Sequence, residues 1–394
     1  MLTWCEIRRE ALRHNVAMVR RAIGPGAELV AVVKANAYGH GLREIASLCA
    51  AEGLRWFGVI EVGEAVLLRE VLGPSVRLLI LGYVEPEEIA AALAVGAELA
   101  IFDASHAAEV QAAAAACDAR ARVHLKIDTG MGRHGVPPEE GLALAERCRT
   151  WPNLILEGVW THLAQADAAD PRYTEYQLQR WAALCEAMAQ RGLLPPVRHA
   201  ANSAGALLYP AARGTAVRCG IVLYGLWPHP ALAPRLQAQG FHLEPVLTWK
   251  SRLIQVRTVP ARTAIGYGGT YVTPRETLLG ILGVGYADGY DRGLSNLGQV
   301  LVRGVRCPVV GRVCMKHLMV DLGPAARQGP LQVGEEAVLV GRQGSAEISV
   351  DEMAAWLDTI NYEITTRIPE RIPRLIREGS DPAQACPASG PVGL

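Results

Sequence analysis

Apolar and amphipathic segments alternate along the first part of the chain, from about residue 28 to residue 226. The segments between the apolar runs carry apolar residues at helical spacing, as in residues 42–53 and 173–192. This alternation is typical of repeated βα units around a parallel sheet, and eight runs predict a closed (β/α)8 barrel. The eight apolar runs cover residues 28–35, 56–61, 76–83, 98–103, 121–128, 154–163, 197–203 and 216–225.

The pattern changes after a proline-rich passage at residues 227–236. Short strands separated by turn residues follow, with almost no helix, and they predict a second, mainly β domain. We therefore expect a barrel at residues 1–235, a mainly β domain at 236–377 and a tail at 378–394. The tail is rich in small and turn-forming residues, which predicts disorder.

Composition narrows the classes of function. Lys+Arg and Asp+Glu both total 39, so no charge excess points to nucleic acid, and a compact neutral substrate fits better. The nine cysteines show neither zinc-site nor secreted disulfide spacing, so we expect reduced thiols, no metal site and a cytoplasmic protein. The N-terminus lacks a signal-peptide pattern, and no run of about 18 uncharged apolar residues predicts a membrane span.

Lys34 is the first candidate for chemistry. Only four lysines occur, and Lys34 lies at the end of an apolar strand in the segment AVVKANAYGHG, residues 31–41. An ammonium group that leaves an apolar strand is partly desolvated, which lowers its pKa and suits it to Schiff-base formation. A strand-end lysine that simply reaches solvent is an equal alternative from this segment alone.

The last two predicted barrel strands lead into a candidate phosphate site. Loops at these positions commonly bind phosphate through backbone N–H groups and a small hydroxyl, and Ser203, Gly220 and Ile221 are placed for that. For Ser203 alone, a helix N-cap is the more frequent role. For Arg218 alone, a surface salt bridge is the simpler interpretation.

Several segments together resemble the alanine racemase family. KANAYGHG (34–41) is similar to the lysine signature of that family, and WCEIRREALRHN before it is similar to the family's N-terminal segment. The resemblance covers residues 3 to 375, and its motifs agree in order and spacing. The further matching segments are HLKIDTGMGRHG (124–135), VRHAANSAGALL (197–208), AIGYGGTY (264–271), GVGYADGYDRGLSN (283–296), GRVCMKHLMVDL (311–322) and NYEITTRIPERIPR (361–374).

The resemblance implies pyridoxal 5'-phosphate as cofactor and a two-base proton exchange on its aldimine with alanine. By this resemblance we expect Lys34 to bind the cofactor and serve as one base, and Tyr267 to serve as the other. We also expect Arg218 to face the pyridine nitrogen, with His162 in line with it and the tyrosine; a guanidinium there would leave the nitrogen unprotonated and weaken the electron sink. The residues implied to hold the cofactor phosphate are Tyr38, Ser203, Gly220, Ile221 and Tyr362.

The resemblance also implies a substrate site and a partner. Arg133, the backbone N–H of Met315 and Tyr286 bind the substrate carboxylate side, and Lys126 is a candidate for a carbamate that orients Arg133. By the same resemblance we expect a homodimer in which the second domain of one subunit reaches the active site of the other. We also expect the product, D-alanine, to serve as a precursor of peptidoglycan. The chain departs from the family after Met315, where Lys316 replaces the usual aspartate.

Each of these residues has a plainer interpretation when taken alone. His162 fits a barrel-core histidine, Tyr267 fits a turn tyrosine between glycines, and Lys126 fits a strand lysine paired with Asp128. The family match is what shifts the balance toward catalysis.

Three other functions compete with an alanine racemase. A non-catalytic pyridoxal-phosphate carrier would share the barrel but not the second domain with its Tyr267, Tyr286 and Met315. A barrel-type decarboxylase would place an acidic residue, not Arg218, at the pyridine nitrogen. A serine or broad-specificity racemase stays open, although Tyr286 and Tyr362 would crowd a large substrate side chain.

Overall fold

A computed structural model describes residues 1–379 of the chain as two compact units. The barrel unit comprises Leu12–Glu244, and the β unit comprises Met1–Ala11 together with the chain from Pro245 onward. Of the tail predicted at residues 378–394, only 378 and 379 are described, and the remainder lies outside the described residues.

Eight parallel strands form the barrel unit, which confirms the predicted barrel. They follow one another in the order β8-β7-β6-β5-β4-β3-β2-β9, and each coincides with one predicted apolar run. The barrel is nearly closed, because hydrogen bonds join each of the two end strands to a residue that flanks the other: Thr215 N donates to Arg198 O at 2.9 Å, and Arg218 N donates to Ala201 O at 3.0 Å. The strands are β2 (Glu28–Val32), β3 (Trp56–Val59), β4 (Arg77–Ile80), β5 (Ala97–Ile101), β6 (Ala121–Lys126), β7 (Leu154–Trp160), β8 (Val197–His199) and β9 (Ala216–Cys219).

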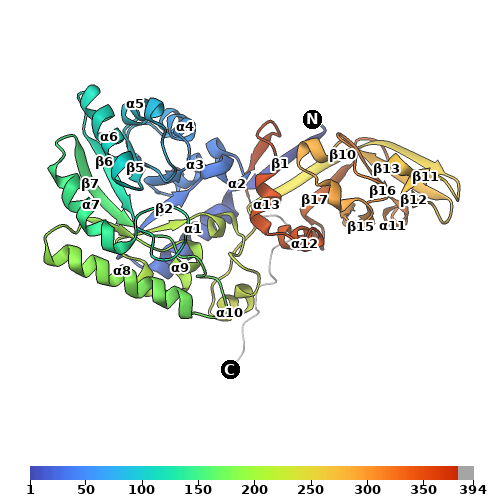
Figure 1. Cartoon of the computed structure of the whole chain (residues 1–394). Helices are drawn as coiled ribbons and strands as arrows, with labels where there is room; N and C mark the ends of the chain where they lie inside the picture. The colour runs from blue at the N-terminus through green and yellow to red at the C-terminus, as the bar shows by residue number, and fades with distance from the viewer. Residues whose placement is uncertain (380–394) are drawn as a thin grey trace. The chain divides into compact units, whose positions relative to one another are not determined.

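Helices connect the barrel strands and lie outside them in Figure 1. Several have side-chain caps, such as Asp103, which accepts from His106 N at the start of α6. Most residues of the strands are buried, because one face packs on the helices and the other fills the barrel. The helices are α1 (Arg9–Ile23), α3 (Leu42–Ala51), α4 (Val62–Leu72), α5 (Pro86–Ala94), α6 (Ala104–Ala116), α7 (Pro138–Thr150), α8 (Arg172–Gln190), α9 (Ser203–Leu208) and α10 (Leu232–Ala238).

The β unit is built on a sheet with the path β15-β14-β17-β10-β1-β19. β13 and β16 extend from β10, and β18 pairs with β17. Three short helices are α11 (Gly323–Ala326), α12 (Val350–Trp356) and α13 (Asn361–Thr366). The strands are β1 (Thr3–Arg8), β10 (Leu247–Val259), β11 (Ala264–Ile265), β12 (Tyr271–Val272), β13 (Thr277–Leu282), β14 (Gln299–Val302), β15 (Val305–Pro308), β16 (Leu318–Asp321), β17 (Glu336–Gln343), β18 (Ala346–Ile348) and β19 (Arg374–Arg377).

The first strand of the chain belongs to this second sheet. β1 pairs antiparallel with β10 and parallel with β19, with Cys5 opposite Trp249 on one side and Arg374 on the other. The barrel domain predicted at residues 1–235 therefore includes a strand of the second sheet. The sequence does not show this, because the partners of β1 lie more than two hundred residues away and no local pattern reveals such a pairing.

Three kinds of feature bear on partners, metals and covalent links: membrane-spanning helices, groups of metal ligands and disulfides. Within residues 1–379, no helix has the length and apolar character needed to cross a membrane. In the same range, no three His, Cys, Asp or Glu side chains are grouped to hold a metal ion. The eight cysteines of this range are free thiols, and Cys386 lies outside it.

Candidate active site

A left-handed turn follows β2 and carries Lys34. The five residues of α2 (Lys34–Tyr38) include four non-glycine residues, 35–38, with φ between 52° and 54°. L-residues avoid this region, so such a run persists only where its surroundings fix it. Asn36 Oδ1 accepts from Leu42 N at 2.8 Å, which anchors the turn to α3. The turn places Lys34 and Tyr38 beside the C-terminal end of the barrel strand.

The Lys34 amine is easier to deprotonate than an ordinary lysine. Partial burial lowers its pKa, the nearby Arg133 guanidinium lowers it further, and Glu64 acts in the opposite direction. A larger share of neutral amine at neutral pH makes Lys34 a better nucleophile and base.

Tyr38, Ser203 and Gly220 meet at the ends of β2, β8 and β9. Gly220 N donates to Ser203 Oγ at 3.2 Å, and a Cβ on Gly220 would lie 2.6 Å from Tyr38 Oη, so only glycine allows the phenol this close. Ser203 is not the helix N-cap, because Asn202 fills that role by accepting from Gly205 N. Burial raises the pKa of Tyr38, so its phenol stays protonated and can donate.

The next residue, Ile221, begins the 3₁₀ helix η2 (Ile221–Tyr224). Backbone N–H groups at a helix start, together with two hydroxyl groups, have the chemistry of a phosphate site.

Arg218 lies inside the barrel and is only 4% exposed, which excludes the surface salt bridge. All five of its side-chain hydrogen bonds use Nη1 and Nη2. Burial lowers the pKa of Arg218 to about 9, still above neutral pH, so the guanidinium keeps its charge. Its acceptors are His199 Nδ1 (2.8 Å), His199 O (2.8 Å), Thr161 O (2.8 Å), His162 Nδ1 (3.2 Å) and Ala200 O (3.3 Å).

His162 and Lys126 share this cationic environment. The pKa of His162 is lowered well below its usual value by burial and then by Arg218, Lys126, Arg133 and Lys34, so the imidazole is neutral. Burial is also the main reason that the pKa of Lys126 falls to about 7, with Arg218 contributing. Five side chains that the sequence singled out are therefore near one another at this end of the barrel: Lys34, Lys126, Arg133, His162 and Arg218.

Lys126 is not paired with Asp128 in the way the plainer interpretation requires. Its Nζ donates to Ile127 O at 2.9 Å, whereas the Asp128 carboxylate accepts from the backbone N–H groups of residues 130–132. Burial alone would raise the pKa of Asp128, but these hydrogen bonds lower it overall. Asp128 thus shapes the loop that leads to the exposed Arg133.

The other predicted site residues lie in the β unit and are largely exposed. Tyr267 opens a turn between β11 and β12 and is 73% exposed. Tyr286 and Met315 are 42% and 59% exposed. Tyr362 is the second residue of α13 and is partly buried.

The loops that carry Tyr286 and Met315 are held against each other. Tyr286 N donates to Cys314 O, and Ala287 N donates to Met315 O, both at 3.0 Å. Lys316 Nζ donates to Asp288 Oδ1 at 2.5 Å, and Arg371 donates to the same oxygen at 3.0 Å. The ammonium that replaces the family aspartate is therefore matched by a buried carboxylate and ties the two loops together.

Sequence reasoning missed a group of buried polar residues in the barrel interior. Glu98, His124 and His199 are 4%, 0% and 0% exposed and lie on β5, β6 and β8. A signal was available, because His124 and Lys126 are two positions apart and so face the same side of one strand. A histidine or glutamate within an apolar barrel strand indicates a polar interior contact.

Comparisons with known proteins agree with this geometry. Residues 7–228 match the family model "Alanine racemase, N-terminal domain", and residues 246–376 match "Alanine racemase, C-terminal domain". Alanine racemase from Symbiobacterium thermophilum is 44% identical over 94% of this chain and 96% of that protein. The protein of the same name from Desulforamulus reducens is 42% identical over 94% and 98%.

Solved structures lead to the same family. Alanine racemase from Bacillus anthracis, solved with bound L-Ala-P, has a TM-score of 0.89 at 34% identity and 95% coverage of both chains. Alanine racemase from Streptomyces coelicolor has a TM-score of 0.87 at 37% identity, covering 95% of this chain and 98% of that one. The chain therefore belongs to the alanine racemase family, which consists of pyridoxal-phosphate-dependent isomerases.

Proposed function

We propose that this protein interconverts L-alanine and D-alanine with Lys34 and Tyr267 as the two bases. The observation that carries the proposal is the group at the C-terminal ends of β2, β8 and β9: a lysine with a lowered pKa, a buried arginine and a phosphate-type cradle. The family match over both domains supports the assignment of that group to racemisation.

The residues present fit pyridoxal phosphate. Tyr38 Oη, Ser203 Oγ and the backbone N–H groups at Gly220 and Ile221 would hold the phosphate. Tyr362 is a further phosphate ligand that the family match suggests. Arg218 would face the ring nitrogen with Nε–H, since its hydrogen bonds in the barrel use Nη1 and Nη2. The bound cofactor supplies an electron-withdrawing ring that makes the substrate Cα–H bond acidic.

Lys34 exchanges the Cα proton on one face of the substrate. Its lowered pKa provides the neutral amine that accepts a proton, and the neighbouring Arg133 stabilises the neutral form. Tyr267 exchanges the proton on the opposite face through its phenol oxygen. Arg218 would keep its proton and leave the ring nitrogen of the bound cofactor unprotonated, so the ring would be a weaker electron sink, which favours return of the proton to Cα.

The substrate carboxylate would be bound by Arg133, by the N–H of Met315 and by Tyr286. Lys126 supports the orientation of Arg133, since a pKa of about 7 leaves much of its amine neutral and able to add carbon dioxide as a carbamate. A carbamate would convert a buried cation beside Arg218 and Arg133 into an anion, which relieves the repulsion among them.

Further parts of the proposal concern assembly and role. The exposed Tyr267, Tyr286 and Met315 support a homodimer in which the β unit of one subunit completes the barrel site of the other. We place the enzyme in the cytoplasm, where it supplies D-alanine for peptidoglycan precursors. It acts on a small amino acid and has neither a nucleic-acid nor a membrane partner. A serine or broad-specificity racemase is the alternative, and substrate competition distinguishes the two.

A reduction experiment tests the cofactor assignment. The purified protein should absorb at about 420 nm, and borohydride should abolish the band and leave the cofactor on one lysine. Because the chain has four lysines, peptide mass spectrometry separates Lys34 from Lys126, Lys250 and Lys316. Chiral analysis of L-alanine after incubation should find D-alanine. A coloured protein that never forms D-alanine would support the carrier instead.

A further inference from the structure

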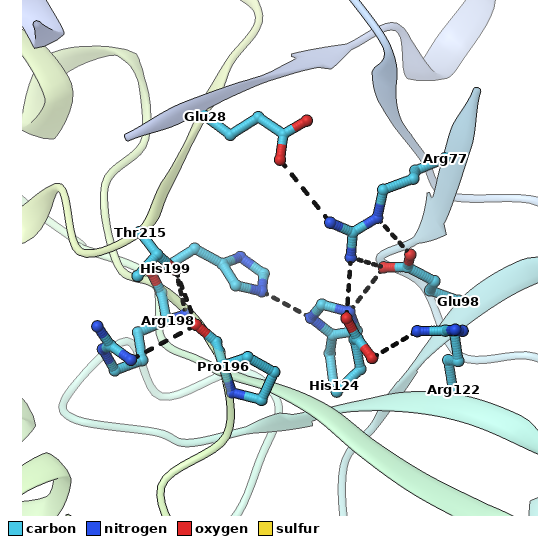
Figure 2. Close-up of polar contacts among 10 residues, drawn as sticks. Glu28, Arg77, Glu98, Arg122, His124, Pro196, Arg198, His199 and Thr215 are labelled. Atoms are coloured by element: carbon cyan, nitrogen blue, oxygen red, sulfur yellow. Dashed lines mark hydrogen bonds and ion pairs between the residues drawn. The ribbon is translucent and has the colours of Figure 1, made fainter. Parts of the chain in front are cut away.

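A continuous line of polar side chains runs through the barrel interior from Arg218 to Arg77. His199 Nδ1 accepts from Arg218 Nη1 at 2.8 Å, and His199 Nε2 lies 3.0 Å from His124 Nδ1. His124 Nε2 lies 2.8 Å from Glu98 Oε2, and Glu98 forms a two-point pair with Arg77 at 2.7 and 3.1 Å. Figure 2 shows the His199–His124–Glu98–Arg77 part of this line.

Arg218 fixes the position of every proton in the line. A guanidinium only donates, so His199 Nδ1 must be an acceptor and carry no proton. The proton of His199 is then on Nε2 and is donated to His124 Nδ1. His124 must in turn carry its proton on Nε2, which is donated to Glu98. Each neutral imidazole therefore accepts on one side and donates on the other, and the carboxylate ends the line.

The charges around this line agree with a neutral His199 and an anionic Glu98. The pKa of His199 is lowered well below its usual value by burial and then by Arg218. Burial alone would raise the pKa of Glu98, but hydrogen bonds from His124 and Arg77 lower it, so Glu98 is an anion. Arg77 also approaches Glu28 and Glu157, and Arg122 pairs with Glu157, so three carboxylates face three guanidinium groups when Arg218 is included.

The barrel is shaped to admit these rings. The pairing of β6 with β7 shifts between Val123 and His124, which brings Gly158 opposite His124. A Cβ on Gly158 would lie 2.2 Å from His124 Nδ1, so any larger residue would displace the imidazole. The Trp160 ring stacks on His199 with an interplanar angle of 0°, and Arg218 lies over the same ring at 4.9 Å. Both contacts hold the His199–Arg218 pair in place.

We propose that Glu98 is a positioning residue for Arg218 and acts through the fixed tautomers of His124 and His199. None of the five acceptors of Arg218 is a carboxylate, so the anionic end of this line is the charge that balances the buried guanidinium. Loss of that charge would weaken the hydrogen bond from Arg218 Nη1 to His199 Nδ1. The guanidinium could then move away from its place at the ring nitrogen. The inference rests on the proposed place of Arg218 at that nitrogen.

Nitrogen NMR of the unmodified holoenzyme with labelled histidine provides the first test. We expect His199 and His124 to be neutral, each with its proton on Nε2. A protonated Nδ1 on either ring would overturn the proposal, whether or not the enzyme racemises alanine. This measurement needs no variant and does not depend on activity, so its failure is distinct from a failure of the proposed function.

Matched variants provide the second test. Glu98→Gln removes the charge at the end of the line, whereas Glu157→Gln removes a carboxylate that also contacts Arg77 but not His124. We expect Glu98→Gln to lower kcat about 10-fold with KM for alanine little changed, and to move the imidazole N–H proton signals upfield. Glu98→Asp should recover part of kcat. Equal effects of Glu98→Gln and Glu157→Gln on kcat and on these signals would overturn the proposal.

Discussion

The two units present their functional side chains in opposite ways. In the barrel unit Arg218 is 4% exposed and its side chain has five hydrogen bonds, whereas Tyr267 in the β unit is 73% exposed. Buried groups with several partners are positioned by their own unit. Exposed side chains leave their final position to whatever surface covers them, and the proposed dimer supplies that surface. The side chains of the barrel unit are thus positioned within that unit, whereas under the proposed dimer the exposed side chains of the β unit would depend on assembly.

The largest expected effect tests this division directly. Lys34→Ala and Tyr267→Phe each remove one base, so each homodimer should lose about 1,000-fold or more in activity. If the two bases meet between subunits, a mixed dimer has one site with both lesions and one intact site. Random reassortment makes about half the dimers mixed, so activity should return to about a quarter of the parent value. No recovery, with subunit exchange confirmed independently, would refute the shared site and leave the cofactor assignment standing.

The second prediction concerns the buried side of the comparison. Arg218→Glu places a carboxylate among acceptors that lose their donor, so the apoprotein should lose about 3–5 kcal/mol of unfolding free energy in urea titrations. In the holoenzyme the carboxylate would stabilise a protonated ring nitrogen, with the proton taken from solvent, and so strengthen the electron sink. Racemisation should fall and a new long-wavelength band should form with alanine. Arg218→Lys, which keeps the charge, is the control for the band. An unchanged spectrum would show that Arg218 is not at the ring nitrogen.

The sequence predicted the barrel well because its strands are continuous apolar runs. It also predicted that Lys34 would lie at a strand end and that Ser203 would follow one of the last two barrel strands, since both follow from the order of the apolar runs. It could not predict the left-handed turn at residues 35–38, because no glycine there indicates positive φ. It could not predict the hydrogen-bonded line from Arg218 through His199 and His124 to Glu98 either. That line depends on a register shift that brings Gly158 opposite His124, and the register of a strand pair cannot be read from the sequence of one strand.

The buried groups of the barrel interior also predict how the stability of the protein depends on pH. The pKa of His199 is lowered in the folded state, so folding favours its neutral form, and its contribution is fully present above the ordinary value of 6.5. That contribution is lost as pH falls below 6.5, at up to about 1.4 kcal/mol per pH unit for this group. Glu98, whose pKa is also lowered, adds a loss only at still lower pH. The melting temperature of the apoprotein should therefore fall between pH 7 and pH 5.

The control for this pH effect is His199→Asn, which removes the titrating group. Its melting temperature should be lower at pH 7, but the decrease between pH 7 and pH 5 should be smaller than in the parent. If both proteins lose the same amount over this range, His199 is not the group that senses the acid, and His162 would be the next to test because its pKa is lowered too.

The smallest expected effect lies on the exposed side, at Lys316. Lys316→Asp restores the family residue but sets a second carboxylate beside Asp288, which would keep Arg371 as its partner. Because the Lys316 side chain is half exposed, solvent screens the pair, and we expect KM for alanine to change only a few-fold. Cofactor absorbance should not change.

A change in KM could come from loss of the ammonium or from repulsion between the two carboxylates. Lys316→Met separates these causes, since it removes the ammonium without adding that repulsion. If both variants raise KM equally, the ammonium positions the loop of Met315. If only Lys316→Asp raises KM, repulsion at Asp288 is responsible. Loss of the cofactor band in either variant would assign Lys316 a structural role.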